Sequence, residues 1–215
     1  MNKSFDHYLG HFILYDPIPW VRIGLEAFLR PWIAQSHAVA SLNELKVALA
    51  QNPRQTVIME LYGVQERLYD GLRFILHAQE CWPGAAWVVL TDVENQSVLH
   101  LLSLIPNISL VSKRDNLGFI LTGISSANHG LRCHSPEIRR MLAESSVKPM
   151  KALSHSEWKI LALMVAGFST QSIANNIQRS YKTVSSHKQS IKNKLGLNQV
   201  SFIRFILSCR MCYAV

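Results

Sequence analysis

The sequence predicts two units in succession, an α/β unit built on a doubly wound parallel sheet and an all-α unit of four helices. Within its 215 residues, strand-like runs alternate with helical stretches up to about residue 128, and beyond residue 151 every periodic segment is helical. The charge is also divided: residues 146–215 carry ten Lys and Arg against one acid. A chain of this length fits one or two domains, and these contrasts favour two.

Four short runs rich in β-branched and aromatic residues predict the strands. These runs cover residues 11–15, 56–61, 86–91 and 109–112. Apolar residues recur at helical spacing over residues 21–28, 42–51, 71–78, 96–104 and 117–128. Strands buried on both faces and joined by crossover helices form parallel sheets, whose functional sites lie at the carboxyl ends of the strands.

A polar, basic stretch over residues 129–150 predicts a linker. Pro136 and Pro149 limit its regular structure to one short helix over 136–144. We therefore expect a first domain over 1–128, a linker over 129–150 and a second domain over 151–215.

Capping signals divide the second domain into four helices. Ser154 followed by Glu157 matches a capping box, and its apolar helix stops near Gly167. The later helices start after Ser169, Ser180 and Asn198 and cover about 171–177, 181–195 and 199–209. Short connections force these helices to cross steeply.

The charge of the second domain indicates its partner. Residues 1–145 carry a net charge of −1, whereas residues 146–215 carry +9, with Glu157 as the single acid. A basic module attached to a near-neutral unit is typical of nucleic-acid binding, although charge alone fits a merely solvated basic face equally well.

The third helix of this domain has two distinct faces. Val184, Ile191 and Leu195 fall on its core face. The opposite side carries Lys182, Ser185, Ser186, Lys188, Gln189 and Lys192. Positive and hydrogen-bonding side chains on one helix face suit a reader of the DNA major groove. His187 fits a phosphate contact or a packing role equally, and Lys194 is expected to be a solvated charge.

Residues 153–197 resemble the LuxR/NarL-type helix-turn-helix. The shared elements are LSxxExxIL at the start, GxS, IA, SxxTVxxH and KLG. The resemblance implies that Lys182 and Thr183 meet phosphates and that Ser185, Ser186 and Gln189 face base edges. It also implies that Lys188 and Lys192 reinforce these contacts.

The first domain resembles the receiver domain of FixJ/RcsB-like response regulators, and most closely the enterobacterial capsule-regulator group. The resemblance places a degenerate phosphorylation pocket at Asp16, Glu60, Thr91 and Lys113. The family's second acid falls on Pro17, and its phosphoacceptor aspartate falls on Glu60, anchored by the downstream Asp70-Gly71-Leu72.

These departures predict a receiver that works without phosphorylation. Pro17 offers no ligand to Mg²⁺, and the extra methylene of Glu60 displaces its carboxylate from the in-line position. A permanent carboxylate can partly imitate the phosphorylated form, or Glu60 and Lys113 can be a remnant ion pair. A receiver that is still phosphorylated is a further alternative.

The remaining features predict a cytoplasmic transcription regulator without enzymatic activity, cofactor or metal. The longest apolar run, 160–168, is too short to span a membrane, and residues 1–10 lack a signal-peptide pattern. Cys209 and Cys212 form one isolated C-x-x-C pair, which indicates no metal site.

The expected main partner is double-stranded DNA. An apolar surface in the last helix, at Val200, Ile203 and Leu207, predicts a homodimer or a heterodimer with a related response regulator. Such a heterodimer could be the protein's main form of action. RNA polymerase is a further candidate partner, and a membrane is not.

Overall fold

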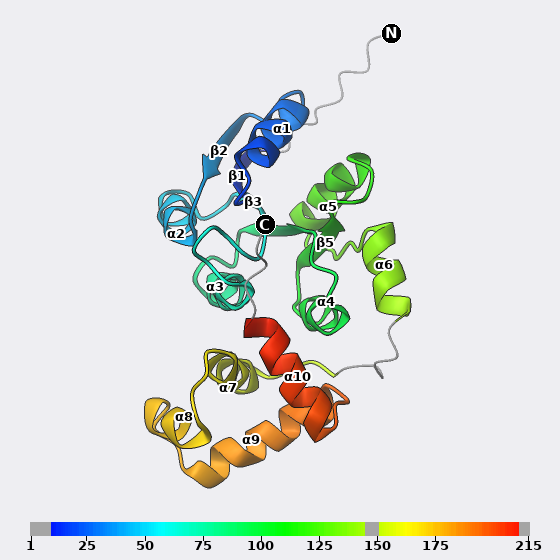
Figure 1. Ribbon diagram of the computed structural model, residues 1–215. Coiled ribbons are helices and arrows are strands. Elements are labelled where there is room, and N and C mark those ends of the chain that lie inside the picture. The colour runs from blue at the N-terminus through cyan, green and yellow to red at the C-terminus, as the bar shows by residue number, and fades with distance from the viewer. Residues whose placement is uncertain (1–9, 145–150, 211–215) are drawn as a thin grey trace.

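The computed structural model describes residues 10–144 and 151–210, and its elements follow one another in two groups (Figure 1). The first group holds the strands β1 (His11–Tyr15), β2 (Gln35–Val39), β3 (Thr56–Met59), β4 (Ala86–Thr91) and β5 (Ile108–Ser112). Its helices are α1 (Pro19–Leu29), α2 (Leu42–Gln51), α3 (Leu68–Cys81), α4 (Gln96–Ser103), α5 (Gly118–Asn128) and α6 (Pro136–Ala143). The second group holds α7 (His155–Val165), α8 (Thr170–Asn176), α9 (Tyr181–Lys194) and α10 (Gln199–Arg210).

The five strands form one parallel sheet in the order β2-β1-β3-β4-β5. This confirms the predicted doubly wound architecture. Helices α1 and α5 cover one face of the sheet, and α2, α3 and α4 cover the other (Figure 1). Every residue of β3 and β5 is buried, as expected for strands covered on both faces.

The sequence pattern does not predict the strand β2, because its sequence, QSHAV, is short and polar. It is an edge strand in which only Val39 is buried. An edge strand with one covered face needs few apolar residues, so it leaves a weak hydrophobic pattern.

Gly71, in the first turns of α3, lies very close to the loop that follows β3. A Cβ atom at this position would lie 1.9 Å from the carbonyl oxygen of Leu61. Only glycine lets α3 pass so close to the loop that carries Glu60.

Part of the predicted linker packs against the sheet, which argues against a domain end at residue 128. The amide of Leu110 donates to the carbonyl of Cys133 at 2.7 Å, and the amide of Ser135 donates to the carbonyl of Leu110 at 3.0 Å. These bonds satisfy the outer edge of β5, and α6 packs on α4 and β5 with Ile138 fully buried. The predicted boundary leaves this packed segment out of the first unit.

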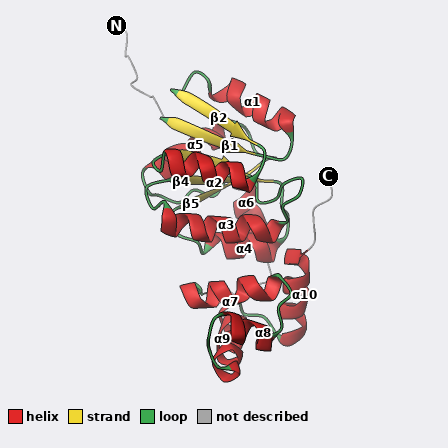
Figure 2. Cartoon of the chain, turned by 90° about the vertical axis from the view of Figure 1, so that its left-hand side faces the viewer, coloured by secondary structure: helices red, strands yellow, loops and turns green. Residues whose placement is uncertain are grey.

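The second group forms the predicted four-helix arrangement. Glycines with positive φ, Gly167 at +99° and Gly196 at +64°, follow α7 and α9 and reverse the chain at their ends. Helices α7 and α10 contact α3, whereas α9 packs against α7 and α8 (Figure 2). In both views α9 lies on the side of this group that faces away from the sheet. Among the described residues, no helix is long and apolar enough to cross a membrane.

Candidate DNA interface and acid cluster

The helix α9 is fixed at its start by a cap and along its inner face by apolar contacts. Ser180 accepts a hydrogen bond from the amide of Thr183 at 3.1 Å, as a helix N-cap does. Val184, Ile191 and Leu195 are at most 1% exposed. The residues predicted to pack are therefore buried, and the other side of the helix is presented outward.

All seven residues predicted to contact DNA lie on this one helix. Those with exposed side chains are Lys182, Ser185, Ser186 and Gln189, and those that are half-buried are Thr183, Lys188 and Lys192. The helix therefore carries a surface with hydrogen-bonding groups at its centre and lysines beside them. This is the composition that groove reading requires, and the individual roles stay predictions.

Asn193 belongs to the same outer face, although the prediction from sequence does not single it out. The Gln189 side-chain amide donates to the Asn193 carbonyl oxygen at 3.0 Å. The signal available in the sequence was spacing, because residues four apart on a helix are neighbours. Asn193 thus extends the row of amide groups by one turn.

The expectation that Lys194 is a solvated charge is wrong. Its Nζ lies 2.6 Å from Glu157 Oε2, and its side chain is 30% exposed. Glu157 sits in the first turn of α7, 37 positions earlier, so no local pattern could have shown the pair.

The four residues of the predicted pocket lie together at the carboxyl ends of β1, β3, β4 and β5. Lys113 Nζ lies 2.6 Å from Asp16 Oδ2 and 3.0 Å from Glu60 Oε2. Asp16, Glu60 and Thr91 are at most 2% exposed. One lysine therefore serves two buried carboxylates.

Glu60 is the most enclosed member of this cluster. Its Oε1 accepts from the amide of Leu61 at 2.7 Å and its Oε2 from the amide of Asp92 at 3.3 Å. Burial raises the pKa of Glu60 to about 7, although Lys113, a hydrogen bond from Thr91 and the Leu61 amide oppose the shift. The carboxylate is therefore held by several donors but desolvated.

A hydrogen bond between two loops lies beside this cluster. The buried Tyr62, in the loop after β3, donates its hydroxyl to Asp92 Oδ1 at 2.7 Å, and Asp92 follows β4. The bond joins the two loops whose backbone amides hold Glu60. Neither residue stood out in the sequence, because the contact spans 30 positions.

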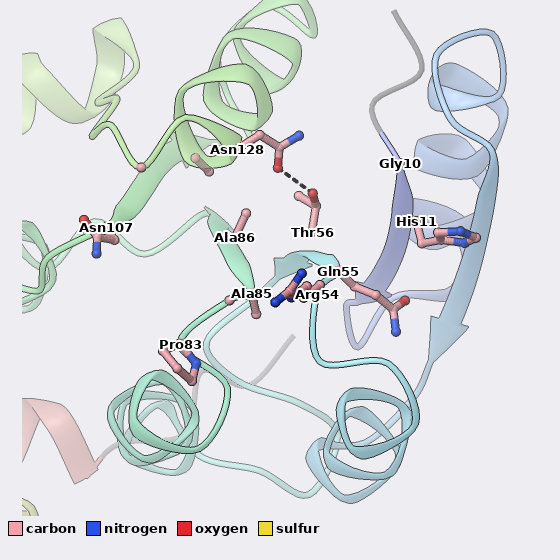
Figure 3. A pocket seen from close by; sticks show the side chains of 13 residues that line it. Gly10, His11, Arg54, Gln55, Thr56, Pro83, Ala85, Ala86, Asn107 and Asn128 are labelled. Carbon is pink, nitrogen blue, oxygen red and sulfur yellow. Dashed lines mark hydrogen bonds between the residues drawn. The ribbon is translucent and has the colours of Figure 1, made fainter.

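A separate polar pocket lies at the amino ends of the strands, opposite the acid cluster (Figure 3). Thr56 Oγ1 donates to Asn128 Oδ1 at 2.7 Å between β3 and the end of α5. The His11 and Asn107 side chains lie at opposite sides of this pocket and do not converge in Figure 3. We assign it no role.

The cysteines offer no metal site in the part of the chain that the structure describes. Cys209 is fully buried in α10, and Cys212 lies outside the described residues. No group of three or more His, Cys, Asp or Glu residues able to hold a metal occurs within residues 10–144 and 151–210.

Comparison with known proteins assigns one part of the chain to a family. Residues 151–203 match the family described as bacterial regulatory proteins, luxR family. The transcriptional regulatory protein RcsB of Escherichia coli K12 is 24% identical over 204 residues, which cover 91% of this chain and 93% of RcsB. Residues 151–203 therefore form a luxR-family domain, and the chain as a whole is similar to RcsB.

Solved structures of RcsB match this chain over nearly its full length. A two-component response regulator RcsB–DNA complex matches with a TM-score of 0.59 and 25% identity, covering 94% of this chain and 98% of that one. A structure of two RcsB dimers bound to two parallel DNAs matches with a TM-score of 0.57 and 24% identity, covering 94% and 98%. Both matched structures are of RcsB with DNA, and the family that matches residues 151–203 is one of bacterial regulatory proteins.

Proposed function

We propose that this response regulator recognises specific DNA sequences and that its receiver-like unit works without phosphorylation. The observation that supports phosphorylation independence is the burial and hydrogen bonding of Glu60. This side chain is fully buried and already accepts hydrogen bonds from two backbone amides, beside Lys113 at 3.0 Å. A phosphoryl donor would have to displace these partners to reach the carboxylate.

The residues around Glu60 do not fit the magnesium ion that receivers of this type use. Magnesium requires near-octahedral oxygen ligands and in such sites is held by carboxylates. Pro17 supplies no oxygen from its side chain, and Asp16 is committed to Lys113 at 2.6 Å. We therefore assign no phosphoryl-transfer step to this cluster.

The position of the recognition helix supports a permanently competent state. The main contacts of helix α9 are with α7 and α8 of its own group, and its outer side chains are exposed or half-buried. In Figure 2 the sheet and its helices lie on the other side of α7 and α10. No rearrangement is then needed to present α9 to a groove.

Incubation with acetyl phosphate and Mg²⁺ tests the proposal. Intact-mass measurement should show no added phosphoryl group, and affinity for a duplex selected by the protein from random DNA should stay unchanged. Glu60→Asp provides a matched control that restores the shorter acid, and Glu60→Gln removes the carboxylate. A stoichiometric, acid-labile mass increase that disappears in Glu60→Gln would contradict phosphorylation independence.

Sequence reading by α9 is tested by separating charge from base contact. Lys188→Ala and Lys192→Ala should weaken binding to all duplexes and flatten the log-log salt slope by roughly one unit each. Ser186→Ala and Gln189→Ala should cost about 1–3 kcal/mol on the selected site and little on a scrambled duplex. An unchanged ratio of selected to scrambled affinity in both variants would rule out base reading by this face.

Binding as a dimer is supported by the apolar outer face of α10. Val200, Ile203 and Leu207 are 59%, 49% and 51% exposed. Apolar side chains spaced along one helix face suit packing against a second subunit, and RcsB is found as dimers on DNA. We propose that α10 pairs with α10 of a second copy or of a related response regulator.

Footprinting with and without a candidate partner distinguishes these two dimers. Protection of two half-sites about 10 base pairs apart is expected, and Ile203→Asp should reduce it to weak, single-site binding. One isolated half-site at saturation, unchanged by Ile203→Asp, would exclude the α10 dimer. In gel shifts with a mixture of this protein and a partner of different size, a band of intermediate mobility would indicate the heterodimer.

A further inference from the structure

Glu157 links the start of α7 to the far half of the recognition helix. Its Oε2 accepts from the Ser154 amide at 2.7 Å and from Lys194 Nζ at 2.6 Å. Its Oε1 accepts from the Ser190 hydroxyl at 2.7 Å. The residue is 3% exposed, and all three donors converge on one carboxylate.

We propose that Glu157 is a positioning residue for DNA recognition: its carboxylate fixes the rotation of α9 about its own axis and so sets where Ser186 and Gln189 point. This inference rests on the proposed base reading by α9. It adds to that reading a residue that touches no DNA itself.

The two contacts on α9 lie on one flank of the helix. Ser190 and Lys194 are four positions apart, so they are neighbours along the helix surface. At 100° per residue this flank lies between the buried side of Ile191 and the outer side of Gln189. Hydrogen bonds at two successive turns of one flank resist rotation of the helix.

The apolar contacts of α9 hold the helix in place but constrain its rotation less sharply than directional hydrogen bonds do. Burial of Val184, Ile191 and Leu195 is favourable over a range of rotations because the hydrophobic effect is non-directional. A rotation of roughly 15° moves a side-chain atom roughly 6 Å from the axis by roughly 1.5 Å. That displacement exceeds the range of distances that a hydrogen bond to a base edge tolerates.

Other features of the molecule agree with this role. The amide of Lys151 donates to the carbonyl of Lys194 at 2.9 Å, which fixes the same end of α9 through its backbone. Hydrogen bonds from Lys194, Ser154 and Ser190 outweigh the burial of Glu157 and lower its pKa to about 2, so the anchor is charged at neutral pH.

The test uses the full chain and two duplexes, one selected from random DNA by the unmodified protein and one scrambled. The measured quantity is the ratio of the two affinities at fixed salt. Glu157→Gln should lower this ratio about tenfold, while binding to the scrambled duplex changes less than threefold. Ser190→Ala, which leaves the capping box intact, should lower it about threefold.

Ser154→Ala is the matched control. It removes the side-chain cap of α7 and leaves both contacts to α9 in place, so it should reduce thermal stability without changing the ratio. An equal fall of the ratio in Ser154→Ala and Glu157→Gln would show a general structural effect and overturn the proposal. An unchanged ratio in Ser190→Ala would also overturn the proposal. This second test remains valid even if Glu157→Gln fails to fold.

Gln189→Ala separates this inference from the function on which it rests. One outcome is that Gln189→Ala lowers the affinity ratio while neither of the single variants Glu157→Gln and Ser190→Ala lowers it. In that case the positioning role is wrong and base reading by α9 stands. If neither Gln189→Ala nor Ser186→Ala changes the ratio, base reading by α9 is wrong and the positioning role fails with it.

Discussion

The two units of this chain each bury a glutamate against a lysine, and the two sites have opposite electrostatics. Glu60 lies 3.0 Å from Lys113 and Glu157 lies 2.6 Å from Lys194. Burial raises the pKa of Glu60 to about 7, whereas burial of Glu157 is outweighed by its hydrogen bonds, which lower its pKa to about 2. A buried pair of the same residue types therefore has no fixed protonation behaviour.

Desolvation by burial is the largest influence on both carboxyl groups, and the difference is whether the surrounding hydrogen bonds and charges outweigh it. Lys113 is shared between Glu60 and Asp16, so two buried acids depend on one cation. Glu157 has its lysine to itself, and it also accepts from a serine hydroxyl and a backbone amide at a helix start. The receiver-like unit retains a crowded acid cluster, and the DNA-binding unit uses its one acid for structure.

The largest expected effect comes from removing the shared lysine. Lys113→Met should lower the unfolding free energy by about 3–5 kcal/mol, because it leaves the buried Asp16 and Glu60 without the cation that they share. Lys194→Met is the matched comparison and should cost clearly less, since its side chain is 30% exposed and Glu157 keeps two other donors. Urea unfolding followed by circular dichroism measures both, and equal losses would contradict the comparison.

The two glutamates should give opposite dependence of stability on pH. The pKa of Glu60 is raised in the folded state from 4.5 to about 7, so its stabilising contribution is present below about pH 4.5 and is lost as the pH rises through 7. The stability of the natural chain relative to Glu60→Gln should therefore decrease over this range. Urea titrations at several pH values from 5 to 8 check the sign, and a relative increase would refute it.

For Glu157 the pKa is lowered from 4.5 to about 2, so its contribution is present above about pH 4.5 and is lost as the pH falls toward 2. The stability of the natural chain relative to Glu157→Gln should fall on acidification from pH 5 to 3. Thermal unfolding across this range measures the difference. A difference that is constant with pH would mean that the charge of Glu157 is not what stabilises the site.

The smallest expected effect tests the cap alone. Ser154→Ala should cost about 1 kcal/mol, as loss of a helix N-cap does, and Ser41→Ala at the start of α2 should cost a similar amount. Similar losses of unfolding free energy in the two variants would show that the cap at Ser154 is an ordinary one. What distinguishes Glu157 would then be its contacts with α9. A loss several times larger for Ser154→Ala would show that the cap and the α9 contacts are coupled, which urea unfolding of both variants can measure.

Local patterns in the sequence determined most of the secondary structure and the outer face of α9. Alternation of strand-like and helical runs predicted four of the five strands, and capping serines predicted three of the four helices after residue 150. Helical spacing alone separated Val184, Ile191 and Leu195 from the polar side chains. These features follow from interactions between residues a few positions apart, which the sequence displays directly.

Only the tertiary structure decided the contacts between distant positions. The edge strand β2 pairs with β1 although its own pattern is weak, and residues 133–135 pair with β5 although they read as linker. The pairing of Lys194 with Glu157 spans 37 positions, and the sharing of Lys113 by two acids depends on how the sheet orders its strands. Burial and the partners that come with it set the pKa of a carboxyl group, so the opposite behaviour of the two glutamates could be read only from the folded chain.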